Sequence, residues 1–196
     1  AQGWDWELGK AAFAANGDRF AAALTGEVER LDLDGVDLDI EGNGKLEADR
    51  DAYLGFVRKL SGQLRERRRI LTVDTFAYIW NAPNQSWWPE LFPWVDALTT
   101  MGYDEIGAKA PDWRSFEAQK RAAGIHSAKL LLGLPSHLAE WRGSPLDEQI
   151  AWFLQNPTVG VAIWDAQFAS PAWRQASVWR ALSGGGTGAG ATVRAK

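Results

Sequence analysis

Short apolar runs alternate with amphipathic segments along most of the chain, and this alternation constrains the fold more than any other feature. The strand-like apolar runs lie at 33–41, 70–78, 95–103, 129–135 and 159–168. The helix-like segments lie at 18–31, 47–68, 114–124, 146–156 and 171–182. One strand and one helix take roughly 30 residues, the length of a βα unit with parallel strands. The sequence therefore predicts an α/β fold in which helices cover a parallel sheet.

The composition changes after Leu182, where glycine-rich sequence replaces the alternating pattern. We predict one domain over residues 1–183, followed by a flexible tail or linker over residues 184–196. A long loop is predicted over residues 80–93, with Trp80, Trp87 and Trp88 in it. These indoles either line a groove or pack the loop, and the sequence leaves both options open.

Charge and residue usage exclude several classes of function. Lys and Arg number 21 and Asp and Glu 25, a formal net charge of −4, which argues against nucleic acid as a partner. The chain has no cysteine and only two histidines, so we predict no disulfide, no thiol catalysis and no metal site. Its apolar runs are too short to cross a bilayer. The 12 tryptophans either pack helices on the sheet or line a groove for flat ligands such as sugar rings.

The first strand-like run is unusually acidic. Because alternate side chains of a strand share a face, Asp37, Asp39 and Glu41 are expected to project together, with apolar residues between them on the other face. A row of neighbouring carboxylates can keep one member protonated near neutral pH, which is what general-acid catalysis requires.

Two other interpretations compete for this run. Asp32, Asp34, Gly35 and Glu41 match four positions of a calcium-binding EF-hand loop, but Arg30 would then occupy the first ligand position. The run could also be a solvated acidic strand at a sheet edge.

Residues 34–41, DGVDLDIE, resemble the DxxDxDxE signature of glycoside hydrolase family 18, which lies on the fourth strand of a (β/α)8 barrel. Residues 101–104 are similar to the MxYD motif at the end of strand six, and residues 133–135 resemble the start of the loop after strand seven. Trp164 resembles the strand-eight tryptophan that forms the floor of the sugar-binding site. The resemblance covers residues 18–182.

Family members have three βα units before the acidic strand, whereas this chain has about one helix there. We therefore expect an incomplete barrel with strands four to eight. Its exposed sheet edges would favour self-association.

The resemblance implies a substrate-assisted retaining mechanism without a cofactor. Glu41 would be the general acid, and the substrate's own acetamido oxygen would attack the anomeric carbon. Asp39 would orient the acetamido N–H, and Asp37 would share a proton with Asp39. Tyr103 would donate its hydroxyl to the acetamido oxygen, and Asp104 would bind a neighbouring sugar.

Other residues are expected around the sugar. Trp164 would stack under the ring, Met101 would shape the pocket, and Trp80 and Trp141 would line the groove. Asp74 is polar within an apolar strand and either faces the barrel interior or serves another role.

The leading functional hypothesis is a chitinase that hydrolyses β-1,4-linked N-acetylglucosamine polymers. The alternatives are an endo-β-N-acetylglucosaminidase acting on N-glycans, a chitin-binding lectin without activity, and an inactive fragment. An extracellular location is expected because chitin is extracellular.

Overall fold

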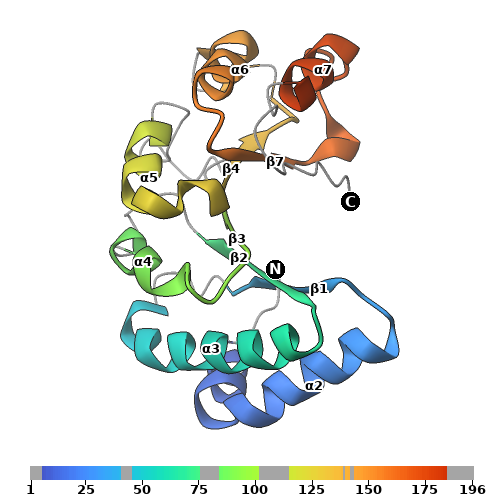
Figure 1. Ribbon diagram of the computed structural model, residues 1–196. Helices are drawn as coiled ribbons and strands as arrows, with labels where there is room; N and C mark the ends of the chain where they lie inside the picture. Colours follow the sequence, from blue (N-terminus) through green and yellow to red (C-terminus); the bar gives the residue numbers. More distant parts are fainter. Residues whose placement is uncertain are drawn as a thin grey trace. The chain divides into compact units, whose positions relative to one another are not determined.

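The computed structural model describes residues 6–40, 46–75, 84–101, 115–138, 140–141 and 144–184 (Figure 1). The chain divides into two compact units, Ala1–Leu98 and Thr99–Lys196. We call them the first and the second unit and describe each by itself. The predicted tail over 185–196 lies outside the described residues, as do residues 76–78 of the second predicted strand.

The first unit alternates helices and strands as predicted. Its helices are α1 (Trp6–Lys10), α2 (Gly17–Arg30), α3 (Arg50–Glu66) and α4 (Trp88–Leu91), with a π-helical turn at Ala11–Ala15 and 3-10 turns at Leu46–Asp49 and Asn84–Trp87. Its strands are β1 (Gly35–Asp39), β2 (Ile70–Thr75) and β3 (Ala97–Thr100), the last of which runs across the unit boundary.

Strands β1 and β2 pair in parallel, in a register that runs from Gly35 opposite Ile70 to Asp39 opposite Asp74. Gly35 allows this pairing because a Cβ at that position would overlap the carbonyl oxygen of Ile70. Asp96 then ties the start of β3 to β2. Its carboxylate accepts a hydrogen bond from the Leu71 N–H (2.8 Å), and its own N–H donates to the Leu71 carbonyl (2.8 Å).

Helix α3 forms because its apolar residues recur at helical spacing and give it one buried face. The residues of that face are Tyr53, Leu54, Phe56, Val57, Leu60 and Leu64. Leu38 of β1 and Leu71 and Val73 of β2 are also buried, at 5%, 1% and 1% exposure. The apolar face of the β1–β2 pair therefore belongs to the core of the first unit.

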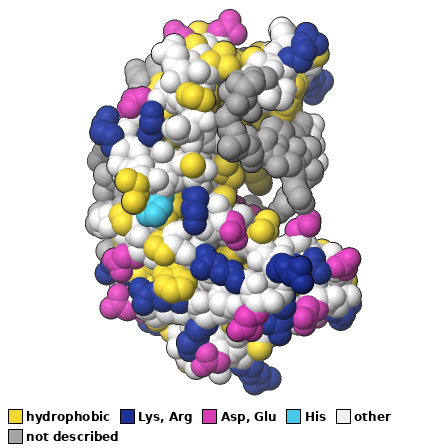
Figure 2. Space-filling view, in the orientation of Figure 1, with side chains coloured by type: hydrophobic (Ala, Val, Ile, Leu, Met, Phe, Trp, Pro, Cys, Tyr) yellow, Lys and Arg dark blue, Asp and Glu magenta, His cyan; other side chains and the backbone are white. Residues whose placement is uncertain are grey.

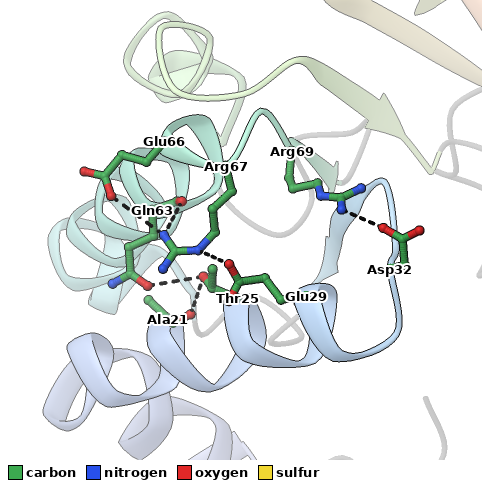
Figure 3. Close-up of polar contacts among 8 residues, drawn as sticks. All are labelled: Ala21, Thr25, Glu29, Asp32, Gln63, Glu66, Arg67 and Arg69. Carbon is green, nitrogen blue, oxygen red and sulfur yellow. Dashed lines mark hydrogen bonds and ion pairs between the residues drawn. The ribbon is translucent and has the colours of Figure 1, made fainter.

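Helices α2 and α3 lie side by side (Figure 1) and are linked by polar contacts along their seam (Figure 3). Phe20 stacks on Phe56 with ring centroids 5.1 Å apart. The Thr25 hydroxyl donates to Gln63 Oε1 (3.2 Å), and Arg67 Nε donates to Glu29 Oε1 (2.7 Å). Acidic and basic side chains are interspersed over these helices (Figure 2), as on an ordinary solvated surface.

The second unit contains the remaining βα pairs. Its helices are α5 (Phe116–Ala123), α6 (Leu146–Gln155) and α7 (Ala176–Gly184), with 3-10 turns at Gly124–Lys129 and Ala166–Phe168. Helix α5 ends at Gly124, whose φ of 55° suits glycine. Strands β4 (Leu130–Pro135) and β7 (Gly160–Trp164) pair in parallel, and β5 (Glu140–Trp141) and β6 (Ser144–Pro145) form a small antiparallel ribbon.

Three boundaries differ from the predictions. The predicted loop over 80–93 contains α4, and the β5–β6 ribbon was not predicted. The last helix begins at Ala176 and not at Pro171. Residues 171–174 form a turn instead, and the Trp173 carbonyl accepts a hydrogen bond from the Trp179 indole (2.8 Å). Trp173, predicted to lie in that helix, therefore sits in the turn, where it is buried as expected.

Candidate functional site

The acidic strand has the geometry that its alternating pattern predicts. Asp37 and Asp39 are both exposed, whereas Leu38 and Ile40 on the opposite face are buried at 5% and 8% exposure. The expectation that these carboxylates stand on a strand buried on both faces is wrong for this pair. Strand β1 is the first in the strand order β1-β2-β3, and the core covers only its apolar face.

The neighbouring strand β2 continues the polar face. Asp37 is in register with Thr72, and Asp39 is in register with Asp74. Register partners in a parallel pair place their side chains on the same face of the sheet. The Thr72 hydroxyl donates a hydrogen bond to Asp37 Oδ1. Asp74, whose direction the sequence left open, therefore lies beside the predicted catalytic row, on the face that Asp37 and Asp39 occupy.

Thr72 was not among the residues predicted for the site. A signal for it exists in the sequence, since residues 71–75, LTVDT, alternate apolar and polar residues as the acidic run does. What the sequence lacks is the register, which alone decides that Thr72 meets Asp37.

The carboxylates on this face affect the pKa of the buried Tyr53 phenol in α3. Burial raises the pKa of Tyr53, and the negative charges of Asp74, Asp39 and Asp37 raise it further. The ring packs edge-on against Phe13, with centroids 5.8 Å apart, so the phenol stays within the apolar core.

The structure excludes one of the two competing interpretations of the acidic run and leaves the other in place. An EF-hand loop is wrong, because Arg30 ends α2 and residues Gly35–Asp39 form a strand paired with β2. Within the described ranges, no group of three or more His, Cys, Asp or Glu side chains could hold a metal ion. A solvated acidic strand agrees with the exposure of Asp37 and Asp39, so geometry alone leaves that alternative in place.

Several predicted site residues lie outside the described residues. These are the predicted general acid Glu41, the motif residues Tyr103 and Asp104, and the loop residue Trp80. Trp141 belongs to β5 by its backbone, and its side chain is likewise outside the description.

The second unit carries the predicted sugar-stacking residue. Trp164 is the last residue of β7 and is 53% exposed, and the peptide bond that follows it is cis. Its carbonyl accepts a hydrogen bond from the Ser136 N–H, and the Ser136 carbonyl accepts one from the Ser170 N–H (2.8 Å). Met101 follows β3 directly and is half-buried.

Most other tryptophans that the structure describes serve packing. Trp87 and Trp88 are 3% and 0% exposed, which decides the open question for them in favour of packing the loop. Trp173 is 1% exposed, and the Trp152 indole donates to Glu117 Oε1 (3.0 Å). Trp164, by contrast, is among the exposed large apolar residues.

A comparison with protein families identifies the class. The chain matches the model of glycosyl hydrolases family 18 over residues 3–180, which include the whole acidic run. The chain therefore belongs to this family and to the glycosidase class that the family defines, of the chitinase-like kind. A search of curated protein sequences gave no match.

Solved structures agree with this assignment. A chitinase from Chromobacterium violaceum ATCC 12472 is similar with a TM-score of 0.70 and 14% identity, over 93% of this chain and 75% of that one. A family 18 chitinase from the chitin utilization locus of Flavobacterium johnsoniae gives 0.61 and 18%, over 90% and 69%. The fold is therefore the predicted one, an α/β barrel type, here incomplete.

A third similar structure contains a bound sugar. Catalytic domain 2 of the Ostrinia furnacalis Group II chitinase, as a mutant in complex with (NAG)5, has a TM-score of 0.53 and 18% identity, over 68% of this chain and 42% of that one.

Among the described residues, none of the helices is both long and apolar enough for a membrane span.

Proposed function

We propose that the protein hydrolyses β-1,4-linked N-acetylglucosamine polymers, with chitin as the substrate. The family match across the acidic run carries this proposal, because it supports a catalytic role for the exposed carboxylates of that run. The oligosaccharide in the similar Ostrinia furnacalis structure supports a ligand that contains N-acetylglucosamine. An extracellular location is part of the same proposal, since chitin is found outside cells.

The proposed reaction begins with protonation of the glycosidic oxygen by Glu41. As the bond to the leaving sugar breaks, the oxygen of the substrate's 2-acetamido group bonds to the anomeric carbon and forms an oxazolinium ion. Asp39 accepts a hydrogen bond from the acetamido N–H and stabilises the positive charge. Glu41, now a carboxylate, takes a proton from a water molecule. The water oxygen bonds to the anomeric carbon as the bond from that carbon to the acetamido oxygen breaks, which opens the oxazolinium ring with net retention.

The remaining residues orient the sugar in this proposal. Asp37 shares a proton with Asp39, and Tyr103 donates a hydrogen bond to the acetamido oxygen and orients it. Trp164 stacks under the sugar ring, for which its exposure at the end of β7 is suited. Met101, Asp104, Trp80 and Trp141 contribute to the surrounding groove.

Glu41→Gln tests the proposal, with Glu66→Gln as its matched control. Glu66 is an exposed glutamate at the end of α3, so the same chemical change there removes no proposed function. We expect Glu41→Gln to lower kcat on chitin oligomers by about 10²–10⁴-fold, because the general acid is lost. Binding of the oligomer, measured by calorimetry, should persist, and Glu66→Gln should behave like the parent.

The same assay separates the alternatives. Cleavage of an N-glycan in preference to chitin oligomers would indicate an endo-β-N-acetylglucosaminidase. Oligomer binding by the parent without cleavage would indicate a lectin, and neither binding nor cleavage would indicate an inactive fragment. Cleavage by Glu41→Gln near the parent rate would overturn the assignment of the general acid.

A further inference from the structure

Thr72 is the described residue whose contact bears most directly on the proposed mechanism. Its hydroxyl donates a hydrogen bond to Asp37 Oδ1 from the neighbouring strand. The two residues are register partners in the β1–β2 pair, so the contact follows from the backbone and not from a chance side-chain rotamer. Thr72 is half-buried, whereas Asp37 is exposed.

The position of the hydroxyl is fixed from the other face of the strand. Leu71 and Val73, on either side of Thr72, are each 1% exposed and anchor β2 in the core. Threonine is also stiff at χ1 because it is β-branched. Asp37, by contrast, is exposed and has no β-branch, so its side chain has more rotamers available. The rigid partner in this pair is therefore Thr72.

The charges around Asp37 make such a partner useful. Asp39 lies two residues along the same face, and Asp74 lies in register beside Asp39. Like charges at this spacing favour rotamers that carry the carboxylates apart. A donor on Asp37 Oδ1 opposes that rotation.

We infer that Thr72 is a positioning residue of the proposed hydrolase, which holds the Asp37 carboxylate so that it can share a proton with Asp39. The inference rests on the proposed function. Thr72 itself touches no reacting atom and acts only through Asp37.

Two substitutions separate the hydroxyl from the shape of the side chain. Thr72→Val keeps the volume and the β-branch but removes the donor, and Thr72→Ser keeps the donor. A hydrogen bond to a charged group is worth enough that its loss should lower kcat roughly 10- to 100-fold, with KM nearly unchanged. Thr72→Ser should stay within roughly threefold of the parent. Thr72→Ala serves as a second hydroxyl-free variant if Thr72→Val does not fold.

The Asp37→Asn background tests whether Thr72 acts through Asp37. If it does, Thr72→Val should cause no further loss of kcat there, since the effects of coupled residues are not additive. A tenfold loss by Thr72→Val in both backgrounds would overturn the inference, because it would indicate a general effect on the sheet. Parent-like kcat in Thr72→Val would overturn it as well.

A spectroscopic measurement keeps the inference independent of activity. The carboxyl ¹³C resonance of Asp37, assigned by its loss in Asp37→Asn, should move in Thr72→Val and Thr72→Ala and return in Thr72→Ser. If the parent cleaves no substrate, the proposed function fails, and this resonance alone decides whether Thr72 holds the carboxylate. A resonance that is the same in the parent and in both hydroxyl-free variants would overturn the inference.

Discussion

The two units present opposite chemistry where their predicted site residues lie. In the first unit the polar face of β1 and β2 exposes carboxylates, while the nearby Trp87 and Trp88 are buried. In the second unit β4 is almost wholly buried, and β7 ends on the exposed indole of Trp164. Among the described residues, the first unit therefore exposes carboxylates on β1, and the second exposes an indole at the end of β7.

Because of this difference, we expect the two units to contribute different roles to the proposed reaction. Carboxylates can exchange protons and stabilise charge, so the described residues of the first unit include the proposed reacting groups. An indole offers area and a π-face but no proton, so Trp164 can contribute binding and orientation. A substitution in the first unit should therefore change kcat, and one at Trp164 should chiefly change substrate binding.

The largest effect is expected from Asp39→Asn. Loss of the charge that stabilises the oxazolinium ion should lower kcat about 10²–10³-fold, by analogy with other preorganised electrostatic groups. Asp51→Asn is the matched control, because Asp51 lies on α3 with a side chain that is 95% exposed and belongs to no proposed site. Steady-state kinetics on chitin oligomers measure both. Equal losses in the two variants would assign the effect to overall charge and remove the special role of the β1 face.

Trp88→Ala should destabilise the first unit without acting on the chemistry. The side chain is fully buried, and truncating a buried tryptophan costs about 3–5 kcal/mol of the free energy of unfolding. Urea unfolding followed by circular dichroism provides the measurement. Trp164→Ala should leave the unfolding midpoint near that of the parent, and a similar loss of stability in both would contradict the distinction between buried and exposed indoles.

Trp164→Ala should instead weaken substrate binding. Aromatic stacking is worth about 0.5–1.5 kcal/mol beyond area burial, which corresponds to roughly a 2- to 13-fold rise in the dissociation constant for a chitin oligomer. Trp164→Phe, which keeps a π-face, should recover part of the affinity. Unchanged affinity in Trp164→Ala would assign the exposed ring to something other than sugar stacking.

The smallest effect concerns alkaline stability. The pKa of Tyr53 is raised, first by burial and then by Asp74, Asp39 and Asp37, so the folded state holds the phenol proton more tightly than the unfolded chain. That contribution to stability is complete below the unfolded pKa, near about 10, and is lost as pH rises above it.

Tyr53→Phe cannot titrate, so it should lose less stability than the parent between about pH 9 and 11. Urea unfolding at several pH values tests this. Parallel pH profiles for the two proteins would show that folding does not raise the pKa of Tyr53.

The alternation of strands and helices could be predicted because burial imposes it locally on each segment. The D-x-D pattern likewise predicted which side chains of β1 share a face, since that depends only on the pleat of the strand. The start of α7 could not be predicted from periodicity. It depends on the hydrogen bond from the Trp179 indole to the Trp173 carbonyl, a contact between two segments that the pattern treats as one helix.

The site shows the same limit. The sequence marked Asp37, Asp39 and Trp164, which carry an alternating pattern or a motif. It did not mark Thr72, because a threonine in a strand is common and its role depends on which residue faces it across the pair. The burial of Trp88 also depends on residues distant in the sequence. The local sequence around a loop tryptophan therefore does not distinguish a ligand-binding indole from one that packs in the core.

Gly35 has a consequence beyond the close approach of two strands. Gly35 is the residue opposite Ile70, where the register of the β1–β2 pair begins. The later pairs follow from this first one, up to Asp39 opposite Asp74. A side chain here would push the strands apart or slide them by a residue, and sliding by one would swap the inward and outward rows. The placement of the proposed catalytic acids therefore depends on residue 35 as well as on the acids themselves, and a larger residue there should abolish activity as loss of a carboxylate would.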